Sequence, residues 1–464
     1  MRELTESLVD KAVQLGASYA EVRVQEVESS SITVENEELR TFGRSGLAGV
    51  GVRVMVDQAV GLTASTVLNP THLGTQVEMA VKAAKAVRTM GEPVTFAAAK
   101  PMQRAVRSPA IKSPECLSDA EKIALVMDAN KAAKLPGVKN RMTTLGWFLD
   151  RRLFTSSEGA AVSIETGMTG LAHTSVASSR GRMESVGDSR SQCSGFEFIL
   201  DTDWGRFTEE ISQRSLQAAA ARAPTPGAYE VVADADLIGI ILHEAFGHAA
   251  EADLVTTQES VLAGRRGEPV ASPLVSIVDA GVVAGGYYLP FDDEGVAKRR
   301  QVIVEDGVLQ RFLHTRETAH KMGVPPSGNA RAQDFGRKPI VRQTNLFMER
   351  GDQSLDELVE AVDDGLYVCG KGAVGGEVDV ALGSFTFRAG PSYTIKKGEL
   401  GEMVRGVSIS GRILDTLHRV AAVGKDVAIR TSVFGGCGKN GQRVRVGYGG
   451  PPVRIESLLV GGGG

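Results

Sequence analysis

The segment from Ala223 to Gly227 constrains the fold of this chain most, because it places two prolines and a glycine within five residues. Proline fixes φ and lacks a backbone N–H, so neither a helix nor a central strand continues through such a segment. A chain of 464 residues is long enough for two or three domains. We therefore predict two domains, residues 1–223 and 228–464, with their boundary at this segment.

The residues before the boundary predict a mixed α/β domain. Apolar residues recur at helical spacing in residues 4–15 and 204–221, Asn69-Pro70 starts another helix, and Ser118 with Glu121 forms a capping box. Segments rich in Val, Ile and Thr, separated by turns, predict an antiparallel sheet. These predicted strands are residues 19–27, 31–34, 47–56 and 59–65, with further strands in 141–186 and a loop over 92–114.

The residues after the boundary predict a β-rich domain with one strongly apolar helix, residues 236–252. Asp306-Gly307 and Lys397-Gly398 stand between extended segments and are typical of hairpin turns. The chain has 54 glycines and only 5% aromatic residues, which favours strands and turns over a helical bundle. The predicted fold class is α+β, with an N-terminal α/β domain followed by a β-rich C-terminal domain that carries the apolar helix.

Charge and hydropathy exclude several classes of protein. The net charge of -4 offers no basic surface for nucleic acid. No apolar run approaches the roughly 18 residues that span a bilayer, so we expect no membrane segment. The amino terminus contains early acidic residues and no continuous apolar core, so it does not resemble a signal peptide and we expect a cytoplasmic protein. The four cysteines lie far apart, which argues against a disulfide framework and a cysteine-only zinc ribbon.

His243, Glu244 and His248 lie in one six-residue stretch inside the predicted apolar helix. Two imidazoles around a carboxylate are used where two His bind zinc and Glu handles the proton of a zinc-bound water. The spacing is unusual, since positions i and i+5 fall about 140° apart on a regular helix. Both rings reach one ion only if the helix is distorted, as in a π-type turn, and Gly247 is where such a distortion costs least. The sequence therefore predicts zinc and a local departure from α geometry.

A catalytic zinc site needs a third protein ligand and an open position for water. Cys437 is the first candidate, because its flanking glycines let the backbone approach closely and Lys439 would favour the thiolate. Glu251 is the alternative, either as a ligand or as a residue that orients a ligand imidazole. The other three cysteines, Cys116, Cys193 and Cys369, are interpreted as small buried or incidental thiols.

These motifs, together with several others in the same order, resemble the TldD/PmbA metallopeptidases, and specifically the TldD branch. The resemblance runs over most of the chain and is densest from His243 to the carboxyl end. Ala252 stands where glycine is familiar in the family, which concerns local helix geometry more than chemistry. The segments that carry the resemblance are residues 243–253, 291–295, 327–331, 342–345 and 437–442.

The resemblance implies Zn2+ bound by His243, His248 and Cys437, with Glu244 as the catalytic carboxylate. It also implies an α/β amino-terminal domain followed by a β-rich carboxy-terminal domain. The family's implied partner is a related, metal-free paralogue, so that this chain would be the catalytic subunit of a heterodimer; a homodimer is the alternative. The implied substrates are unfolded or small peptides.

Two other shared segments carry charged residues whose role the sequence leaves open. Asp292 and Asp293, with Glu294, form either a solvated turn or a group that orders a cleft or holds a substrate amine. Arg331 and Arg342 suit a substrate carboxylate or a main-chain carbonyl, because a guanidinium pairs with both oxygens of a carboxylate. Structural ion pairs are the other interpretation of both arginines.

The sequence thus predicts a zinc metallopeptidase in which Glu244 takes a proton from a zinc-activated water and passes it to the leaving amine. Two alternatives stay open. One is a zinc amidohydrolase that acts on a non-peptide amide, and the other is a non-catalytic scaffold with a structural zinc. A closed four-ligand site would favour the scaffold, whereas three protein ligands and an open position would favour catalysis.

Overall fold

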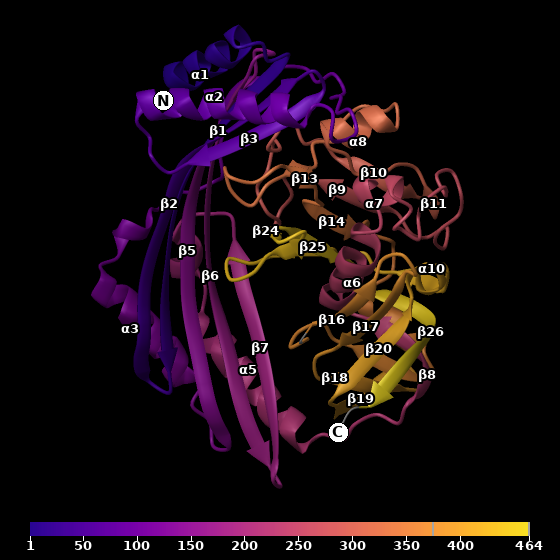
Figure 1. Cartoon of the computed structure of the whole chain (residues 1–464). Coiled ribbons are helices and arrows are strands. Elements are labelled where there is room, and N and C mark those ends of the chain that lie inside the picture. The colour runs from indigo at the N-terminus through magenta and orange to yellow at the C-terminus, as the bar shows by residue number, and fades with distance from the viewer. Residues whose placement is uncertain (374, 463–464) are drawn as a thin grey trace.

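The computed structural model describes residues 1–373 and 375–462. Val374 and residues 463–464 belong to the second predicted domain and lie outside the described residues. Figure 1 shows the long strands of the first half of the chain on one side and the smaller sheets of the second half on the other. The predicted α+β class is confirmed. The division at residues 223–228 stays a prediction; strand β8 (Gly227–Ala233) begins at its edge.

The first sheet is built around four strands of 17 to 19 residues, β1, β2, β5 and β6. Its order is β3-β2-β1-β5-β6-β4, and β7 also pairs with β6. Neighbouring strands are antiparallel except β4, which is parallel to β6. The elements of this half are α1 (Arg2–Gln14), β1 (Tyr19–Glu35), β2 (Glu38–Val56), β3 (Ala59–Ser65), α2 (Pro70–Val87), β4 (Gln103–Arg107), η1 (Pro114–Cys116), α3 (Asp119–Ala132), β5 (Val138–Ser156), β6 (Ala161–Ser179), β7 (Arg182–Gln192), α4 (Glu197–Asp201) and α5 (Trp204–Ala220).

Two predictions about this sheet are wrong. Residues 19–27 and 31–34 form one strand, because the ladder continues through the polar middle of β1, where Ser29 pairs with Ser45 on β2 and with Phe148 on β5. The predicted loop over residues 92–114 contains β4. This strand is short and mostly exposed, so it has no apolar alternation by which the sequence could reveal it.

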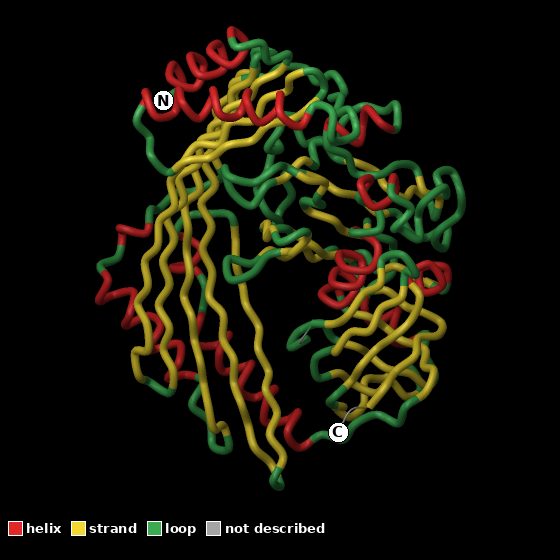
Figure 2. The backbone as a smooth tube through the Cα atoms, in the orientation of Figure 1, coloured by secondary structure: helices red, strands yellow, loops and turns green. Residues whose placement is uncertain are grey.

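Helices cover the first sheet in two groups, which Figure 2 shows toward opposite ends of the long strands. Near one end, α1 and α2 bury apolar residues such as Leu8 and Val77 against Val52 of β2. Toward the other end, α3 and α5 pack on β5 and β6, with Trp204 and Ile211 in the core. Helix α3 has the predicted capping box, in which Ser118 and Glu121 exchange hydrogen bonds.

The second half of the chain forms two larger sheets around one hydrophobic core. Within the described residues, the nine-stranded sheet has the order β16-β17-β20-β26-β8-β15-β18-β19 with β21 beside β26, and the six-stranded sheet has the order β11-β10-β9-β14-β25-β22. Helix α6 (Ala235–Ile241) shares this core with both sheets. Among the described helices, none combines the length and apolar character needed to cross a bilayer.

The predicted hairpin turns of this half are confirmed. Asp306 and Lys397 have φ of 48° and 52°, and each is followed by a glycine with positive φ, as a tight two-residue hairpin requires. The remaining elements are α7 (Ala252–Thr256), β9 (Ile277–Ala280), β10 (Gln301–Glu305), β11 (Val308–Leu309), α8 (Arg316–Lys321), β12 (Ala330–Arg331), β13 (Ile340–Val341), β14 (Asn345–Met348), α9 (Leu355–Glu360), β15 (Asp364–Val368), β16 (Gly376–Asp379), β17 (Ser384–Arg388), β18 (Ser392–Lys396), β19 (Glu399–Val404), β20 (Val407–Arg412), α10 (Ile413–His418), β21 (Val420–Val423), β22 (Ala428–Thr431), β23 (Cys437–Lys439), β24 (Gln442–Val444), β25 (Gly447–Gly450) and β26 (Val453–Gly462).

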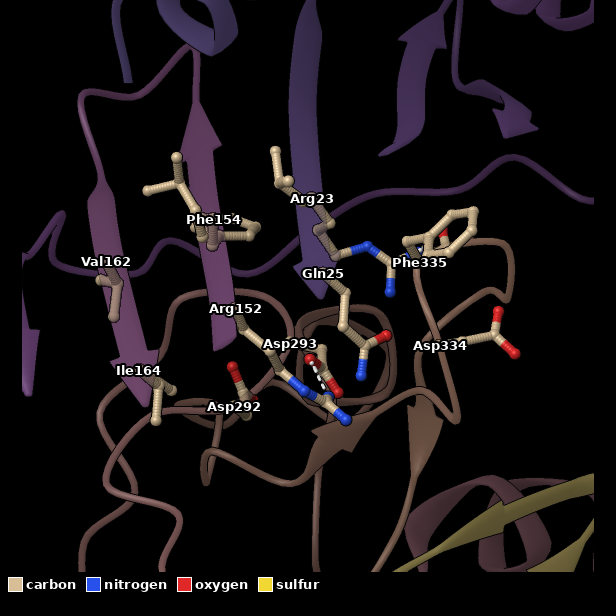
Figure 3. Close-up of a pocket in the computed structure, with 12 residues that line it drawn as sticks. Arg23, Gln25, Arg152, Phe154, Val162, Ile164, Asp292, Asp293, Asp334 and Phe335 are labelled. Atoms are coloured by element: carbon tan, nitrogen blue, oxygen red, sulfur yellow. Dashed lines mark hydrogen bonds and ion pairs between the residues drawn. The ribbon is translucent and has the colours of Figure 1, made fainter. Parts of the chain in front are cut away.

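Buried ion pairs join the first sheet to the loop at residues 291–295. Arg53 of β2 contacts Glu21 at 2.7 Å and Glu294 at 2.9 Å, and all three side chains are at most 1% exposed. Arg152 of β5 donates to Asp293 at 2.8 Å, a contact drawn in Figure 3. Because charges buried in this way are costly to separate, these pairs tie the two halves together.

Close backbone contact at the same junction gives a prediction for stability. A Cβ at Gly51 would overlap the carbonyl oxygen of Phe335. We expect Gly51→Ala to lower the free energy of unfolding by about 1–3 kcal/mol, because the neighbour is backbone and has little freedom to shift. Gly43→Ala is the matched control on the same strand, since its Cβ would meet only the Ser31 hydroxyl at 3.7 Å. Equal thermal melting of the two variants would contradict this account of the junction.

Candidate metal centre

The helix that carries His243 and His248 changes geometry between them. Asp234 caps α6 by accepting a hydrogen bond from the Leu237 amide at 2.8 Å. The chain then continues as a π-helical segment, Leu242–Gly247, so the predicted departure from α geometry is confirmed. The helix is shorter than the predicted 236–252, because Glu251 is extended and forms a β-bridge with Leu313 before α7 begins.

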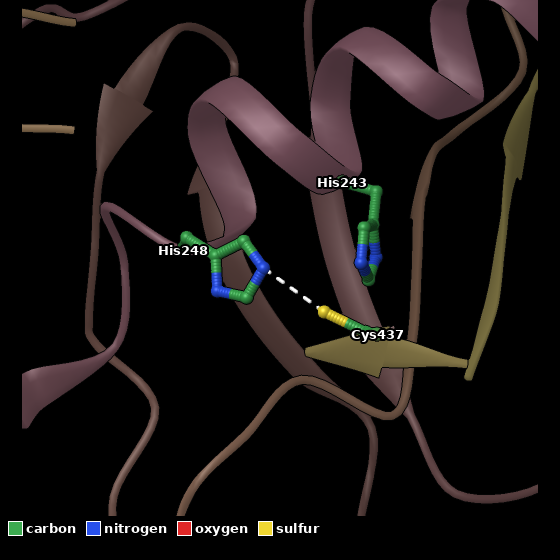
Figure 4. Close-up of side chains that lie close together, drawn as sticks. All are labelled: His243, His248 and Cys437. Atoms are coloured by element: carbon green, nitrogen blue, oxygen red, sulfur yellow. Dashed lines mark hydrogen bonds between the residues drawn. The ribbon is translucent and has the colours of Figure 1, made fainter. Parts of the chain in front are cut away.

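The π-helical turn brings the rings of His243 and His248 close together, and Cys437 of β23 lies against them (Figure 4). One ligand atom from each of the three residues lies within 4.8 Å of the others. The Nε2 atom of His248 and the Sγ atom of Cys437 are 3.0 Å apart. All three side chains are buried, with relative exposures of 4% to 9%. The structure therefore brings the three predicted ligands together from two distant parts of the chain.

Glu251 contacts the opposite side of the His248 ring. Its Oε2 atom lies 3.1 Å from Nδ1 of His248 and is fully buried. A carboxylate in this position accepts the Nδ1–H of a neutral imidazole, which leaves Nε2 free to act as a ligand. Glu251 thus has the geometry of a residue that orients a ligand, and Cys437 has the geometry of the third ligand.

Gln343 and Arg342 hold the two sides of the cluster in place. The Gln343 amide group donates to the carbonyl oxygen of His243 at 2.8 Å, and its backbone N–H donates to Glu251 at 3.2 Å. A Cβ at Gly247 would overlap the amide group of Gln343, so a larger residue here would displace that amide from His243. Arg342 is fully buried and donates to the carbonyl oxygen of Cys437 at 2.7 Å. Both neighbours therefore fix the backbone that presents the ligands.

The charges around the cluster favour a cation. Burial raises the pKa of the Cys437 thiol, but the charges and hydrogen bonds of His243 and His248 outweigh this effect and lower the pKa to about 5. Burial also raises the pKa of Glu251, but His248 and Lys439 lower it to about 2. Burial lowers the pKa of His248, but the same two groups raise it to about 10. Two anionic groups therefore flank the imidazoles at neutral pH, and a bound cation would take the place of the proton on His248.

The role predicted for Lys439 is wrong. Its Nζ atom contacts Glu251 at 2.7 Å and Asp253 at 2.7 Å, so the ammonium is engaged by two carboxylates. The interactions that lower the pKa of Cys437 most are those with the two imidazoles. Lys439 instead neutralises part of the negative charge that orients His248.

Glu244 is placed differently from the other members of the motif. Its side chain is 45% exposed, and its Oε2 atom lies 3.9 Å from Nε2 of His248. A carboxylate that borders the cluster and still reaches solvent is accessible to both a water molecule and a substrate. This position suits a group that transfers protons.

The residues of the cluster fit zinc. Two imidazoles and a thiolate are the borderline-soft donor set that zinc prefers. The Nδ1 atom of His243 is buried and finds no hydrogen-bond partner in the described part of the chain. Such an unsatisfied atom is costly unless it serves a purpose such as binding a metal.

The other predicted site residues do not join this cluster. Asp292 and Asp293 are buried, which overturns their interpretation as a solvated turn. Asp292 accepts the backbone N–H groups of Glu294, Val296 and Ala330, and Asp293 pairs with Arg152. Arg342 supports the Cys437 strand, as described above.

Arg331 is also buried and lies apart from the ligand atoms. It donates to the carbonyl oxygen of Gln343 at 3.1 Å. Sequence reasoning missed Gln343, although it lies in the segment 342–345 that carries the family resemblance. Its place in that segment, next to the candidate residue Arg342, was the signal that could have found it.

Comparisons with known proteins agree with this fold and site. Three family models match the chain: PmbA/TldA metallopeptidase domain 1 over residues 20–88, the central domain over 112–222 and the C-terminal domain over 226–462. A protein of Methanothermobacter thermautotrophicus named metalloprotease is 36% identical over 96% of this chain and 95% of its own. The family models and the name of this relative thus indicate a metallopeptidase. The chain belongs to the PmbA/TldD family.

More distant relatives extend the comparison. A Saccharolobus solfataricus protein named zinc metalloprotease TldD homolog is 27% identical over 98% of this chain and 99% of its own. The crystal structure of TldE from Thermococcus kodakarensis has a TM-score of 0.75, with 18% identity, over 99% of this chain and all of that one. A Thermotoga maritima chain, proposed to modulate a DNA gyrase, reaches a TM-score of 0.81 at 24% identity and covers 99% of both chains. Both solved structures share the whole fold.

Proposed function

We propose that this protein is a zinc metallopeptidase that hydrolyses unfolded or small peptides. His243, His248 and Cys437 hold Zn2+, and Glu244 is the general base. The observation that carries the proposal is the convergence of these three donors beside a half-exposed carboxylate. The name zinc metalloprotease, given to one relative, supports the choice of metal.

Zinc bound in this cluster would polarise the scissile carbonyl and lower the pKa of the attacking water. Glu244 accepts the proton of that water and delivers it to the leaving amine, because its carboxylate borders the cluster and is exposed to the incoming substrate. Glu251 fixes the orientation of His248, and Arg342 fixes the strand of Cys437.

The grouping of donors favours catalysis over a structural zinc. Among the described residues, the cluster contains three ligand side chains, and a closed structural site uses four. The exposure of Glu244 also favours access for a substrate. A peptide substrate is favoured over a non-peptide amide because relatives across the whole chain are named metalloproteases.

We further propose that the active form pairs with a metal-free paralogue of the same family. The likeness to a structure named TldE supports such a partner. A second subunit that covers the candidate metal centre would admit unfolded peptides and exclude folded proteins. A homodimer would meet the same need.

Metal analysis combined with peptide cleavage tests this proposal. We expect about one zinc per chain, cleavage of short peptides that stops when a chelator removes the metal, and no cleavage of folded proteins. Adding the paralogue should raise the activity on short peptides. A metal-free, stable monomer whose activity is indifferent to chelator and to the paralogue would overturn both the zinc and the pairing.

A further inference from the structure

A cavity of about 460 Å³ lies beside the strands that carry Cys437. One wall comes from the inner parts of β1, β2 and β5, and the other comes from residues 434–435 and 443–445. In the ladder of β23 and β24, Val444 pairs with Cys437, so one wall of the cavity is the direct neighbour of a predicted ligand. This cavity is large enough for several non-hydrogen atoms of a ligand.

Arg331 lines this cavity and is a buried cation without a counter-ion. Only 3% of its surface is exposed. Its guanidinium donates to the Gln343 carbonyl oxygen and lies 5.3 Å from the centre of the Tyr287 ring. Among the described residues, no carboxylate oxygen lies within 4.0 Å of it, whereas the nearby Arg152 pairs with both Asp150 and Asp293.

A buried cation without an ion-pair partner is unfavourable for folding, because a carbonyl oxygen, an aromatic ring and the more distant Asp293 replace only part of its hydration. Burial lowers the pKa of Arg331 to about 10, so the group stays charged at neutral pH. Such unpaired groups in a cavity are typical of ligand-binding sites.

The whole cavity has a positive balance of charge. Its lining contains more guanidinium groups than carboxylates, and one of the carboxylates is already paired with Arg152. The cationic residues are Arg152, Arg331, Arg443 and Arg445, and the anionic residues are Asp150 and Asp334. An anionic ligand would therefore find a favourable potential inside.

Gln343 links this cavity to the candidate metal centre. Its carbonyl oxygen accepts from Arg331 at 3.1 Å, and its side-chain amide donates to the carbonyl oxygen of His243 at 2.8 Å. Arg331 and His243 are therefore held by the same residue. A ligand group bound to Arg331 would therefore be linked to His243, a proposed zinc ligand, through the single residue Gln343.

We propose that this cavity binds a carboxylate group of the peptide substrate and that Arg331 is the residue that pairs with it. The inference rests on the proposed function and names the substrate class of the same site. A guanidinium presents two N–H groups that match the two oxygens of a carboxylate. Both the C-terminal carboxylate of a peptide and an acidic side chain supply this group.

Three peptides that differ only in their carboxylates test the proposal on the zinc-loaded protein. The first has an amidated C-terminus and an internal Gln, the second has the same sequence with a free C-terminus, and the third is amidated with Glu in place of Gln. We expect one carboxylate peptide to show a KM at least about tenfold below that of the neutral peptide, with kcat little changed. The peptide whose KM falls shows whether the recognised carboxylate is the C-terminus or an acidic side chain.

Binding of the same peptides to the Glu244→Gln protein, measured by calorimetry, separates recognition from turnover. We expect the dissociation constants to follow the KM values. In the Arg331→Gln protein the advantage of the carboxylate peptide should disappear. In the Arg331→Lys protein it should return in part, because lysine restores the positive charge but not the two parallel N–H donors of a guanidinium. Arg206→Gln is the matched control, since it removes the same charge from a position that is 78% exposed and outside the cavity lining, and it should leave the advantage unchanged.

Two results are decisive whatever the folding of the variants. If the wild-type protein binds and cleaves all three peptides equally, the cavity does not recognise carboxylates and the inference is wrong. If the wild-type protein cleaves none of them but the Glu244→Gln protein binds a carboxylate peptide preferentially, the inference holds and the proposed peptidase function fails.

Discussion

Glu244→Gln is expected to reduce kcat for peptide hydrolysis by about 10²- to 10⁴-fold, while zinc content and melting temperature stay at the wild-type values. An amide has nearly the shape of the carboxylate but does not accept the proton of the attacking water. The side chain is 45% exposed, so the substitution leaves no buried charge unpaired.

The measurement is steady-state hydrolysis of a short peptide by metal-loaded protein, with zinc determined on the same preparation. Glu268→Gln provides the matched control, because it makes the same chemical change at an exposed carboxylate whose ion pair with Arg265 is long, at 3.7 Å. That variant should retain wild-type kcat. Wild-type kcat in Glu244→Gln would remove this residue from the role of base.

Cys437→Ala is expected to lower bound zinc to less than about a tenth of the wild-type content after dialysis against a chelator. The change removes the thiolate and leaves two imidazoles, which hold zinc much more weakly than a three-ligand site. Cys193→Ala is the control, because Cys193 is also buried but burial raises its pKa to about 11. Its removal should leave zinc unchanged.

Glu251→Gln distinguishes the two candidates for the third ligand. If Glu251 only orients His248, its amide variant should weaken zinc binding by about 10- to 100-fold, a smaller loss than that of Cys437→Ala. If the Cys437→Ala protein kept its full zinc content and the Glu251→Gln protein held no zinc, Glu251 would be the third ligand. Competition with a chelator of known affinity measures both losses.

The sequence was sufficient to predict which three side chains meet at the candidate site but only part of its surroundings. The spacing of His243 and His248 predicted the π-helical turn, because two ligands separated by five residues require it. Cys437 was found from its glycine neighbours and from the need for a third donor. These inferences succeeded because ligand chemistry limits the residue types and spacings that are possible.

The contacts around the ligands were beyond sequence reasoning. Lys439 was assigned to the thiol because it is near Cys437 in the chain, but in the fold its ammonium meets Glu251 and Asp253. The sequence leaves Asp292 and Asp293 open between a solvated turn and a group that orders a cleft, whereas in the fold an arginine of the first sheet and backbone amides satisfy them. Such pairings join residues far apart in the chain, and local patterns carry no information about them.

The placement of β1 in the middle of the first sheet has a consequence for how the chain folds during synthesis. Its partner on one side, β2, follows directly, but on the other side Glu21 pairs with Ser156, about 135 residues later. At roughly 5–20 residues per second, the ribosome needs about 7–27 s to supply that partner. The open edge of β1 carries Glu26, Glu28 and three serines in its middle, and charged or polar edges resist pairing with other chains. The polarity that hid this strand from sequence analysis thus protects the nascent chain until β5 emerges.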